Sequence, residues 1–316
     1  MLKTFARALT FAAAATLIAL PATAAEKLRV GKAVAQAFSF VPVDIGVQKG
    51  IFVRHGLEVE YTAFAGDAKM QQAAAADSID ILIGSGPAMA FIVKGSPIKA
   101  VAGMAGPPLL LAIVVRPDGP KTVADLKGRK VSVSTVGSLT YWLVSQTSER
   151  QGWGPNGIQI EPMGAMPGQI AALKRGDIAG VITDLSTAFD LEKKGEARVL
   201  VRFHHIKDFH IHVIFATNKI LAAKPDAVRG FLKGWFETIA FMRQNKAETI
   251  KIAMAVMKKD ESNVSRTYDE IMPMFSDTGR FDAKALETLR KSYVALKLLP
   301  TEPDMSLLYT EAYLPK

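Results

Sequence analysis

Two stretches of the chain combine an apolar strand, a turn of small residues and the start of a helix, and they constrain the fold more than any other feature. One runs from Ile79 to Pro87 and the other from Val131 to Trp142. A helix that starts at the end of a strand presents free backbone N–H groups and its positive dipole end, which together favour an anion or an acceptor group. Two such units, far apart in the chain, predict two α/β domains that face one small ligand.

The sequence around these units alternates strands and helices. Leu57–Tyr61 alternates apolar and acidic residues, as a half-exposed strand does, whereas Ile79–Ile83 is almost entirely apolar, as a parallel strand covered on both faces should be. The run Pro117–Pro120 breaks the alternation, which restarts at Lys130. The pattern therefore predicts two doubly wound α/β lobes.

A chain of 316 residues suits two lobes better than one compact core. Two apolar strands, Leu109–Arg116 and His212–Thr217, are expected to carry the chain between the lobes, with crossovers near Val115 and Phe215 that form a two-stranded hinge. Beyond Pro225 the periodicity predicts a helical C-terminal extension. The expected boundaries are a leader at 1–24, a discontinuous first lobe at 25–114 and 216–316, and a second lobe at 115–215.

The first 24 residues have the pattern of a secretory signal peptide. Lys3 and Arg7 precede an apolar run at 8–20, and small residues surround a predicted cleavage site after Ala24, with cleavage after Ala25 as the alternative. The apolar run is shorter than the roughly 20 residues that a membrane span needs, so we expect no membrane insertion. The chain has no cysteine, which excludes disulfides, thiol nucleophiles and a lipoprotein anchor. We expect an unanchored protein in the periplasm.

The formal net charge is +9, and the leader contributes two lysine or arginine residues and no acid, so the remainder keeps 9 − 2 = +7. A basic balance of this size is compatible with nucleic acid, a membrane surface or an acidic small molecule. The basic residues are scattered and do not form a tract interleaved with aromatic residues. We therefore expect no nucleic-acid partner.

Five side chains near the strand ends are candidates for ligand contact, and each has a structural alternative. Ser85 and Ser138 stand where a serine caps a helix, and both would also face a ligand in a nearby crevice. Asp184 follows a predicted strand, so it either caps the next helix or accepts a hydrogen bond from a ligand amine or hydroxyl. Phe38 and Phe40 lie two apart in a loop, which fits core anchoring or an apolar pocket wall.

The remaining motifs do not indicate an enzyme. Four of the five histidines fall between His204 and His212. His210 and His212 would share a strand face, as metal ligands do, but no carboxylate motif accompanies them, so exposed or interface histidines are expected and no metal. The turn Gly84–Gly86 lacks the third glycine of a dinucleotide loop, because Met89 occupies that position. No nucleophile–base pair is readable, and we expect neither catalysis nor a cofactor.

Several segments match one family in their order and spacing, and together they cover most of residues 28–235. The segments are Pro42–Phe52 with Gly56–Glu60, Ile79–Gly86, Lys94–Lys99, Ala124–Val131 and Ala171–Gly180. On these segments the chain resembles the periplasmic solute-binding proteins of the nitrate/sulfonate/taurine ABC transporter group. That family also includes proteins of the thiamine-precursor type.

The resemblance implies a type II periplasmic binding protein fold, in which two lobes close on a ligand and deliver it to a membrane permease driven by a separate ATPase. The family's pocket positions correspond in this sequence to Gln36, Phe38, Ser85, Gly86, Ser138, Leu139, Thr140 and Asp184. The chain departs from the family at Leu185–Ala188, where a Trp-x-Pro pattern often stands, and the candidate segments contain no arginine to clamp a sulfonate or nitrate. The cysteine-rich motif of the thiamine-pyrimidine-forming enzymes is absent.

We therefore predict a monomeric import receptor for a small organic anion of the sulfonate or carboxylate type. Helix N-termini would bind the anion, and Phe38 and Phe40 would pack against its apolar body. Two other classes remain open: an enzyme of the thiamine-pyrimidine kind, and a receptor for an ATP-independent tripartite transporter or a sensor kinase. Neighbouring genes would separate the two transporter types.

Overall fold

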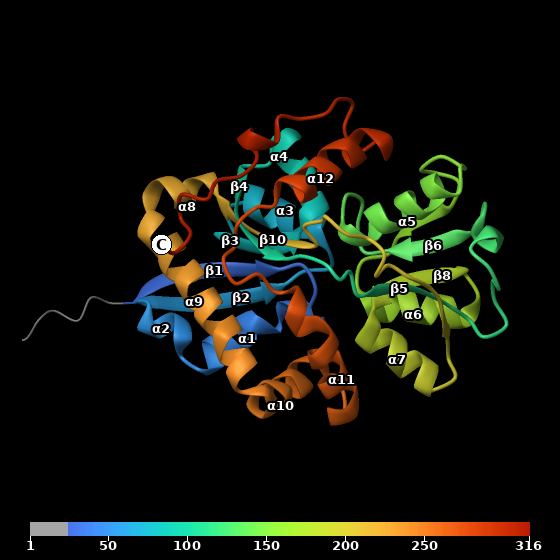
Figure 1. Cartoon of the computed structure of the whole chain (residues 1–316), viewed down its shortest axis with the longest axis horizontal. Helices are drawn as coiled ribbons and strands as arrows, with labels where there is room; N and C mark the ends of the chain where they lie inside the picture. The colour runs from blue at the N-terminus through green and yellow to red at the C-terminus, as the bar shows by residue number, and fades with distance from the viewer. Residues whose placement is uncertain (1–24) are drawn as a thin grey trace, which may run out of the picture.

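The computed structural model describes residues 25–316, which form two α/β lobes that lie side by side (Figure 1). Each lobe contains a five-stranded sheet. The predicted leader, 1–24, lies outside the described residues. Within residues 25–316 there is no helix with the length and hydropathy that crossing a membrane requires.

The sheet of the first lobe has the strand order β2-β1-β3-β10-β4. β1 runs parallel to β2 and β3, and Val30 lies opposite Ile81. β10 comes from much later in the chain, inserts between β3 and β4, and runs antiparallel to both, with Ile214 opposite Ile83. The strands are β1 Glu26–Lys32, β2 Leu57–Ala63, β3 Ile81–Ser85, β4 Ile98–Ala105 and β10 His212–Thr217.

The sheet of the second lobe has the related order β7-β6-β8-β5-β9. β6 runs parallel to β7 and β8, and Val131 lies opposite Gly180. β5 runs antiparallel to β8 and β9, with Ile113 opposite Ile182. The strands are β5 Leu111–Val115, β6 Lys130–Val133, β7 Gln159–Pro162, β8 Gly180–Asp184 and β9 Arg198–Arg202.

The two apolar strands that the sequence assigns to the hinge lie in opposite sheets. β5 belongs to the second sheet and β10 to the first, so the chain crosses between the lobes at 106–110 and 203–211. The crossovers expected near Val115 and Phe215 are therefore displaced, and β5 moves from the first lobe to the second. The physical reason is that both strands are buried inside a sheet, a position that an apolar run permits without specifying which sheet it joins.

Helices pack around both sheets (Figure 1), and several begin at residues whose chemistry favours a helix start. Pro225 starts α9, while Asp260 and Asp282 accept hydrogen bonds at the starts of α11 and α12. The first lobe carries α1 Val41–Gln48, α2 Ile51–Arg54, α3 Asp67–Ala75, α4 Ala90–Val93, α8 Asn218–Ala223, α9 Pro225–Gln244 and α12 Ala283–Ala295. The second carries α5 Leu139–Arg150, α6 Met166–Arg175 and α7 Leu185–Lys193. Two further helices, α10 Lys246–Met257 and α11 Glu261–Ile271, follow α9.

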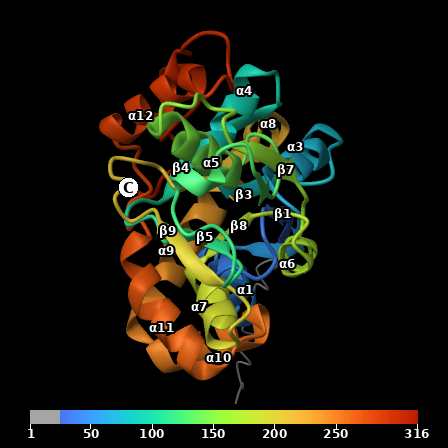
Figure 2. The same ribbon diagram turned by 90° about the vertical axis from the view of Figure 1, so that its right-hand side faces the viewer.

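The C-terminal helices brace the first lobe and reach toward the second. α9 packs along α1 and α2, where Phe231 stacks on Phe52 with ring centroids 5.1 Å apart. α11 lies beside α7 of the second lobe, below the strands in Figure 2. The C-terminal extension therefore contacts both lobes.

A buried ion pair ties the end of β1 to α1. Lys32 Nζ lies 2.7 Å from Asp44 Oδ2, and the two side chains are 4% and 5% exposed. The ring of Tyr61 lies 5.1 Å from Lys32 Nζ. Burial, followed by the hydrogen bond with Asp44, raises the pKa of Tyr61 to about 12. The pair fixes the carboxyl end of β1, from which the loop after this strand begins.

Candidate functional site

A cavity of about 320 Å³ lies between the two lobes. Its walls include the loops after β1 and β2 and the last residue of β3 in the first lobe, and the loops after β6 and β7 and the end of β8 in the second. These loops follow the carboxyl ends of parallel strands, where open α/β sheets place their ligands. Most of the side chains at the wall are apolar, which is typical of a pocket for a small organic molecule.

Eight of the nine predicted ligand-binding residues line this cavity. The first lobe contributes Gln36, Phe38, Phe40 and Ser85, and the second contributes Ser138, Leu139, Thr140 and Asp184. Gly86 does not line it. The sequence therefore predicted where these residues gather, and ligand contact itself remains a prediction.

Phe38 and Phe40 form the aromatic wall of the cavity. They lie at the two ends of a 3₁₀ turn, Phe38–Phe40, rather than in an extended loop, and both are buried. The Phe38 ring meets the edge of Tyr268 on α11, with centroids 6.1 Å apart. The Phe40 ring meets His212 at 4.9 Å. The two interpretations of these residues hold together, because each ring is anchored in the core and also lines the cavity.

Ser85 does not cap a helix. The segment after it is a short 3₁₀ turn, Gly86–Met89, without a side-chain cap. Both the backbone N–H and the hydroxyl of Ser85 donate to the carboxylate of Asp67, each at 3.0 Å. Burial raises the pKa of Asp67 to about 6, because the charged form loses its water, while the Ser85 hydrogen bonds act in the opposite direction. The donors predicted for a ligand at this turn are thus engaged by a buried carboxylate.

Gly86 is a glycine because another backbone passes next to it. Its N–H donates to the carbonyl oxygen of Ile211 at 3.1 Å. A Cβ atom added here would lie 1.9 Å from the carbonyl oxygen of His210. The sequence could not distinguish this packing role from ligand contact, because His210 approaches from more than a hundred residues away.

Replacing Gly86 with alanine is expected to lower the free energy of unfolding by about 3 kcal/mol, because the crossing segment must move away from the new methyl group. Denaturant unfolding measures the change. The matched control is Gly168→Ala in α6, where an added Cβ meets nothing within 4 Å. That variant should be neutral or gain up to about 1 kcal/mol. Equal stability of the two variants would contradict the packing role.

Ser138 caps α5, as predicted. Its hydroxyl oxygen accepts from the N–H of Tyr141 at 3.3 Å and donates to the carbonyl oxygen of Thr135 at 2.7 Å. The same hydroxyl lies 3.0 Å from Thr140 Oγ1, which accepts from the N–H of Ser134. The hydroxyls at this helix start therefore hold the turn together.

Asp184 both caps α7 and lines the cavity, so its two predicted roles are compatible. Its carboxylate accepts from the N–H and the hydroxyl of Thr187, each at 3.0 Å. Thr183 Oγ1 lies 3.4 Å from the same carboxylate. These bonds fix the orientation of the side chain at the cavity wall.

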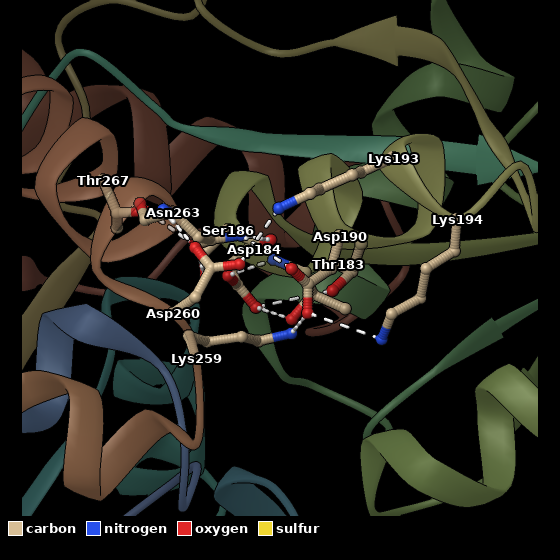
Figure 3. Close-up of polar contacts among 11 residues, drawn as sticks. Thr183, Asp184, Ser186, Asp190, Lys193, Lys194, Lys259, Asp260, Asn263 and Thr267 are labelled. Carbon is tan, nitrogen blue, oxygen red and sulfur yellow. Dashed lines mark hydrogen bonds and ion pairs between the residues drawn. The ribbon is translucent and has the colours of Figure 1, made fainter.

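The lobes also touch beside Asp184, where α7 meets α11 (Figure 3). Ser186 Oγ lies 2.6 Å from Asn263 Oδ1, and Asn263 Nδ2 donates to Asp190 Oδ1 at 3.0 Å. Lys259 forms an ion pair with the same Asp190. Elsewhere the N–H of Ala68 in the first lobe donates to Thr135 Oγ1 in the second at 3.3 Å. The cavity is thus bordered by direct contacts between the lobes.

His212 is a cavity residue that the sequence predicted to be exposed or at an interface, and not to be a ligand contact. It lies at the start of β10 opposite Ser85 and is 6% exposed. Nδ1 has no hydrogen-bond partner among the described residues. Burial lowers the pKa of His212 to about 4, so the ring is neutral near pH 7.

The spacing of His210 and His212 predicted that they share a strand face, but His210 lies outside the strand and accepts from the N–H of Asp282 at 2.9 Å. Within residues 25–316 no group of three or more histidine or acidic residues could hold a metal ion.

Comparison with known proteins places the chain in a family context. The model of the family described as NMT1/THI5 like matches residues 37–249. A putative thiamine biosynthesis protein of Haemophilus influenzae is 30% identical over 122 residues, which are 38% of this chain and only 39% of that protein's length. A putative binding protein of Brucella abortus (strain 2308) is 26% identical over 223 residues, covering 70% of this chain and 68% of that protein.

Solved structures with the same fold cover almost the whole chain. The alkanesulfonate-binding protein SsuA from Xanthomonas axonopodis pv. citri, bound to MOPS, has a TM-score of 0.78 at 17% identity and covers 92% of this chain and 99% of its own. The protein named putative sulfonate ABC transporter, periplasmic sulfonate-binding protein SsuA, from Methylobacillus flagellatus KT has a TM-score of 0.67 at 18% identity, with coverage of 92% and 93%. At these identities the likeness concerns the fold, and it confirms the two-lobed periplasmic binding protein architecture predicted from the sequence.

Proposed function

Since the chain belongs to the NMT1/THI5-like family, we propose that it is the solute-binding component of an ABC importer. It captures one small organic molecule between its lobes and delivers it to a membrane permease, which a cytoplasmic ATPase drives. The observation that carries the proposal is the largely apolar cavity of about 320 Å³, whose walls come from strand ends of both lobes. A site divided between two lobes couples ligand binding to lobe closure.

Lobe closure follows from the placement of the groups that would touch the solute. Phe38 and Phe40 belong to the first lobe, whereas Thr140 and Asp184 belong to the second. A solute that contacts both sets favours the closed arrangement by the free energy of the contacts that exist only there. Within residues 25–316 the chain crosses between the lobes only at 106–110 and 203–211, so rotation about these segments is the motion that admits and releases the solute.

Compartment and partners follow from the same proposal. The periplasmic and ABC-transporter names of the structural neighbours support a periplasmic receptor that meets a permease. The predicted signal peptide at 1–24 would export it. The sequence predicts a sulfonate or carboxylate solute. The carboxylates of Asp67 and Asp184 at the cavity wall would repel such an anion.

A thermal-shift assay with a small-molecule extract of the host tests the proposal on the chain from Ala25 onward. At a solute concentration about 100 times Kd the melting temperature should rise by at least about 5 °C, because binding to the native state alone stabilises it. Native mass spectrometry of protein purified from its own host would then weigh the bound solute. The solute should be recovered unchanged, since conversion to a new mass would favour the enzyme alternative. No stabilisation by any solute would end the proposal.

A further inference from the structure

The cavity wall, as far as residues 25–316 form it, carries two carboxylates and no lysine or arginine. Lys32, just before the cavity loop, pairs with Asp44, and neither residue lines the cavity. The carboxylates belong to opposite lobes, Asp67 in the first and Asp184 in the second. An anion between them would meet negative charge from both sides.

The backbone donors that would offset this repulsion are largely engaged. In the first lobe the N–H of Ser85 donates to Asp67, and that of Gly86 donates to Ile211. In the second lobe the N–H of Tyr141 donates to the capping Ser138. What remains is the first N–H groups of α5 and of α6, which also begins at the cavity wall and has no side-chain cap. These groups lack intrahelical acceptors and can serve a neutral acceptor as well as a charged one.

His212 adds a buried polar ring to the cavity wall. Its ring is more than nine-tenths buried, lines the cavity and has an Nδ1 without a partner among the described residues. Nδ1 itself is closed off from the cavity, so a bound solute would meet the other edge of the ring, which carries Nε2. A neutral imidazole can accept at one nitrogen and donate at the other, which suits an uncharged polar group.

We infer that the cavity selects an uncharged or cationic solute with an apolar body, which donates a hydrogen bond to Asp184 and places a polar atom against the His212 ring. The inference deepens the proposed import function and rests on it. Amides, alcohols and amines fit this description. Sulfonates and carboxylates do not, because no cationic side chain of the cavity wall would neutralise them.

The charge class of the solute is tested without knowing its identity. The small-molecule extract is divided by ion exchange at neutral pH into anionic, uncharged and cationic fractions, and each is offered to the chain from Ala25 onward. The uncharged or the cationic fraction should raise the melting temperature by at least about 5 °C. MOPS, the sulfonate bound by the Xanthomonas neighbour, is the defined sulfonate probe and should leave the melting temperature unchanged.

The outcomes separate the inference from the function on which it rests. Stabilisation by the anionic fraction or by MOPS overturns the inference and leaves the import receptor standing. If none of the fractions stabilises the chain, both fall together. Stabilisation confined to the uncharged or cationic fraction supports both.

Two substitutions test the named residues with the stabilising fraction. His212→Phe removes both ring nitrogens and should weaken binding by at least about tenfold while the solute-free protein stays as stable or becomes more stable, because an unsatisfied buried atom is gone. His204→Phe, at an exposed position of the same segment outside the cavity, is the control and should bind normally. Unchanged binding by His212→Phe would remove this residue from the inference.

Asp184→Asn tests the charge at the second lobe without disturbing the helix cap, because asparagine caps helices as well as aspartate does. The variant should fold with unchanged stability and bind the uncharged or cationic solute about tenfold more weakly, since a neutral amide is a weaker acceptor than a carboxylate. Tighter binding by this variant would mean that the solute carries negative charge, and the inference would be wrong.

Discussion

Replacing Lys32 with methionine should lower the free energy of unfolding by about 3–5 kcal/mol, the largest stability effect that we expect from a single substitution in this chain. Lys32 and Asp44 are almost completely buried and 2.7 Å apart. Without Lys32 the Asp44 carboxylate remains inside the lobe with no cation beside it, and a buried unpaired charge is costly. The change is measured by denaturant unfolding at neutral pH.

A matched control lies on the same strand. Lys27 pairs with Glu58 at 3.7 Å, but its side chain is 67% exposed, so Lys27→Met should change the stability by less than about 1 kcal/mol. The double variant Lys32→Met/Asp44→Leu removes both charges and should recover most of the loss, because an apolar pair of similar volume often replaces a buried ion pair at little cost. A loss in Lys32→Met no larger than in Lys27→Met would show that Asp44 is not held in a water-poor site.

Joining the lobes with a disulfide should slow solute uptake by at least about 100-fold, which is the largest effect on binding that we expect. A Cβ atom on Gly164 in the second lobe would lie 3.6 Å from the Cβ of Ala65 in the first. Disulfides span Cβ–Cβ distances of about 3.5–4.5 Å, so Ala65→Cys/Gly164→Cys should form one on oxidation. The chain has no cysteine of its own, so no other pairing competes. A locked pair of lobes cannot rotate apart to admit the solute.

The uptake rate is measured with the stabilising solute fraction, before and after reduction of the same protein. Reduction should restore the rate of the parent chain. Gly164 has φ of +70°, a conformation that cysteine adopts at some cost, so the single variant Gly164→Cys is the control for this strain. If the oxidised and reduced double variants take up solute equally fast, the cavity fills without lobe separation, and hinge closure is not the binding mechanism.

The position of the candidate site could be predicted because the signals for it are local. Ser138 and Asp184 each stand between a strand and a helix, and a short polar side chain at that point caps the helix in nearly any context. Parallel strands then bring these caps to one edge of a sheet. Local patterns of apolar periodicity and of turn and capping residues also located most of the strands and helices.

Other features of the site depend on contacts between distant parts of the chain, which no local pattern encodes. Asp67 lies 18 positions before Ser85 in the chain, and its carboxylate accepts the hydrogen bonds that the Ser85 turn was predicted to donate to a ligand. His212 enters the cavity only because β10 returns to the first sheet and places it opposite Ser85. Tertiary contacts likewise decide which sheet β5 joins, because both sheets offer an apolar environment. For these reasons the sequence predicted an anion site, whereas we infer an uncharged or cationic solute from the assembled wall.

The insertion of β10 between β3 and β4 also dictates an order of assembly during synthesis. The five strands of the second lobe occupy one continuous stretch, from Leu111 to Arg202, and can pair as soon as that stretch has been made. β3 and β4 pair with each other only through β10, so the first lobe's sheet stays divided until residues 212–217 emerge. The lobe that begins the chain is therefore the one that finishes last, and its early strands wait with open edges for a partner more than a hundred residues downstream.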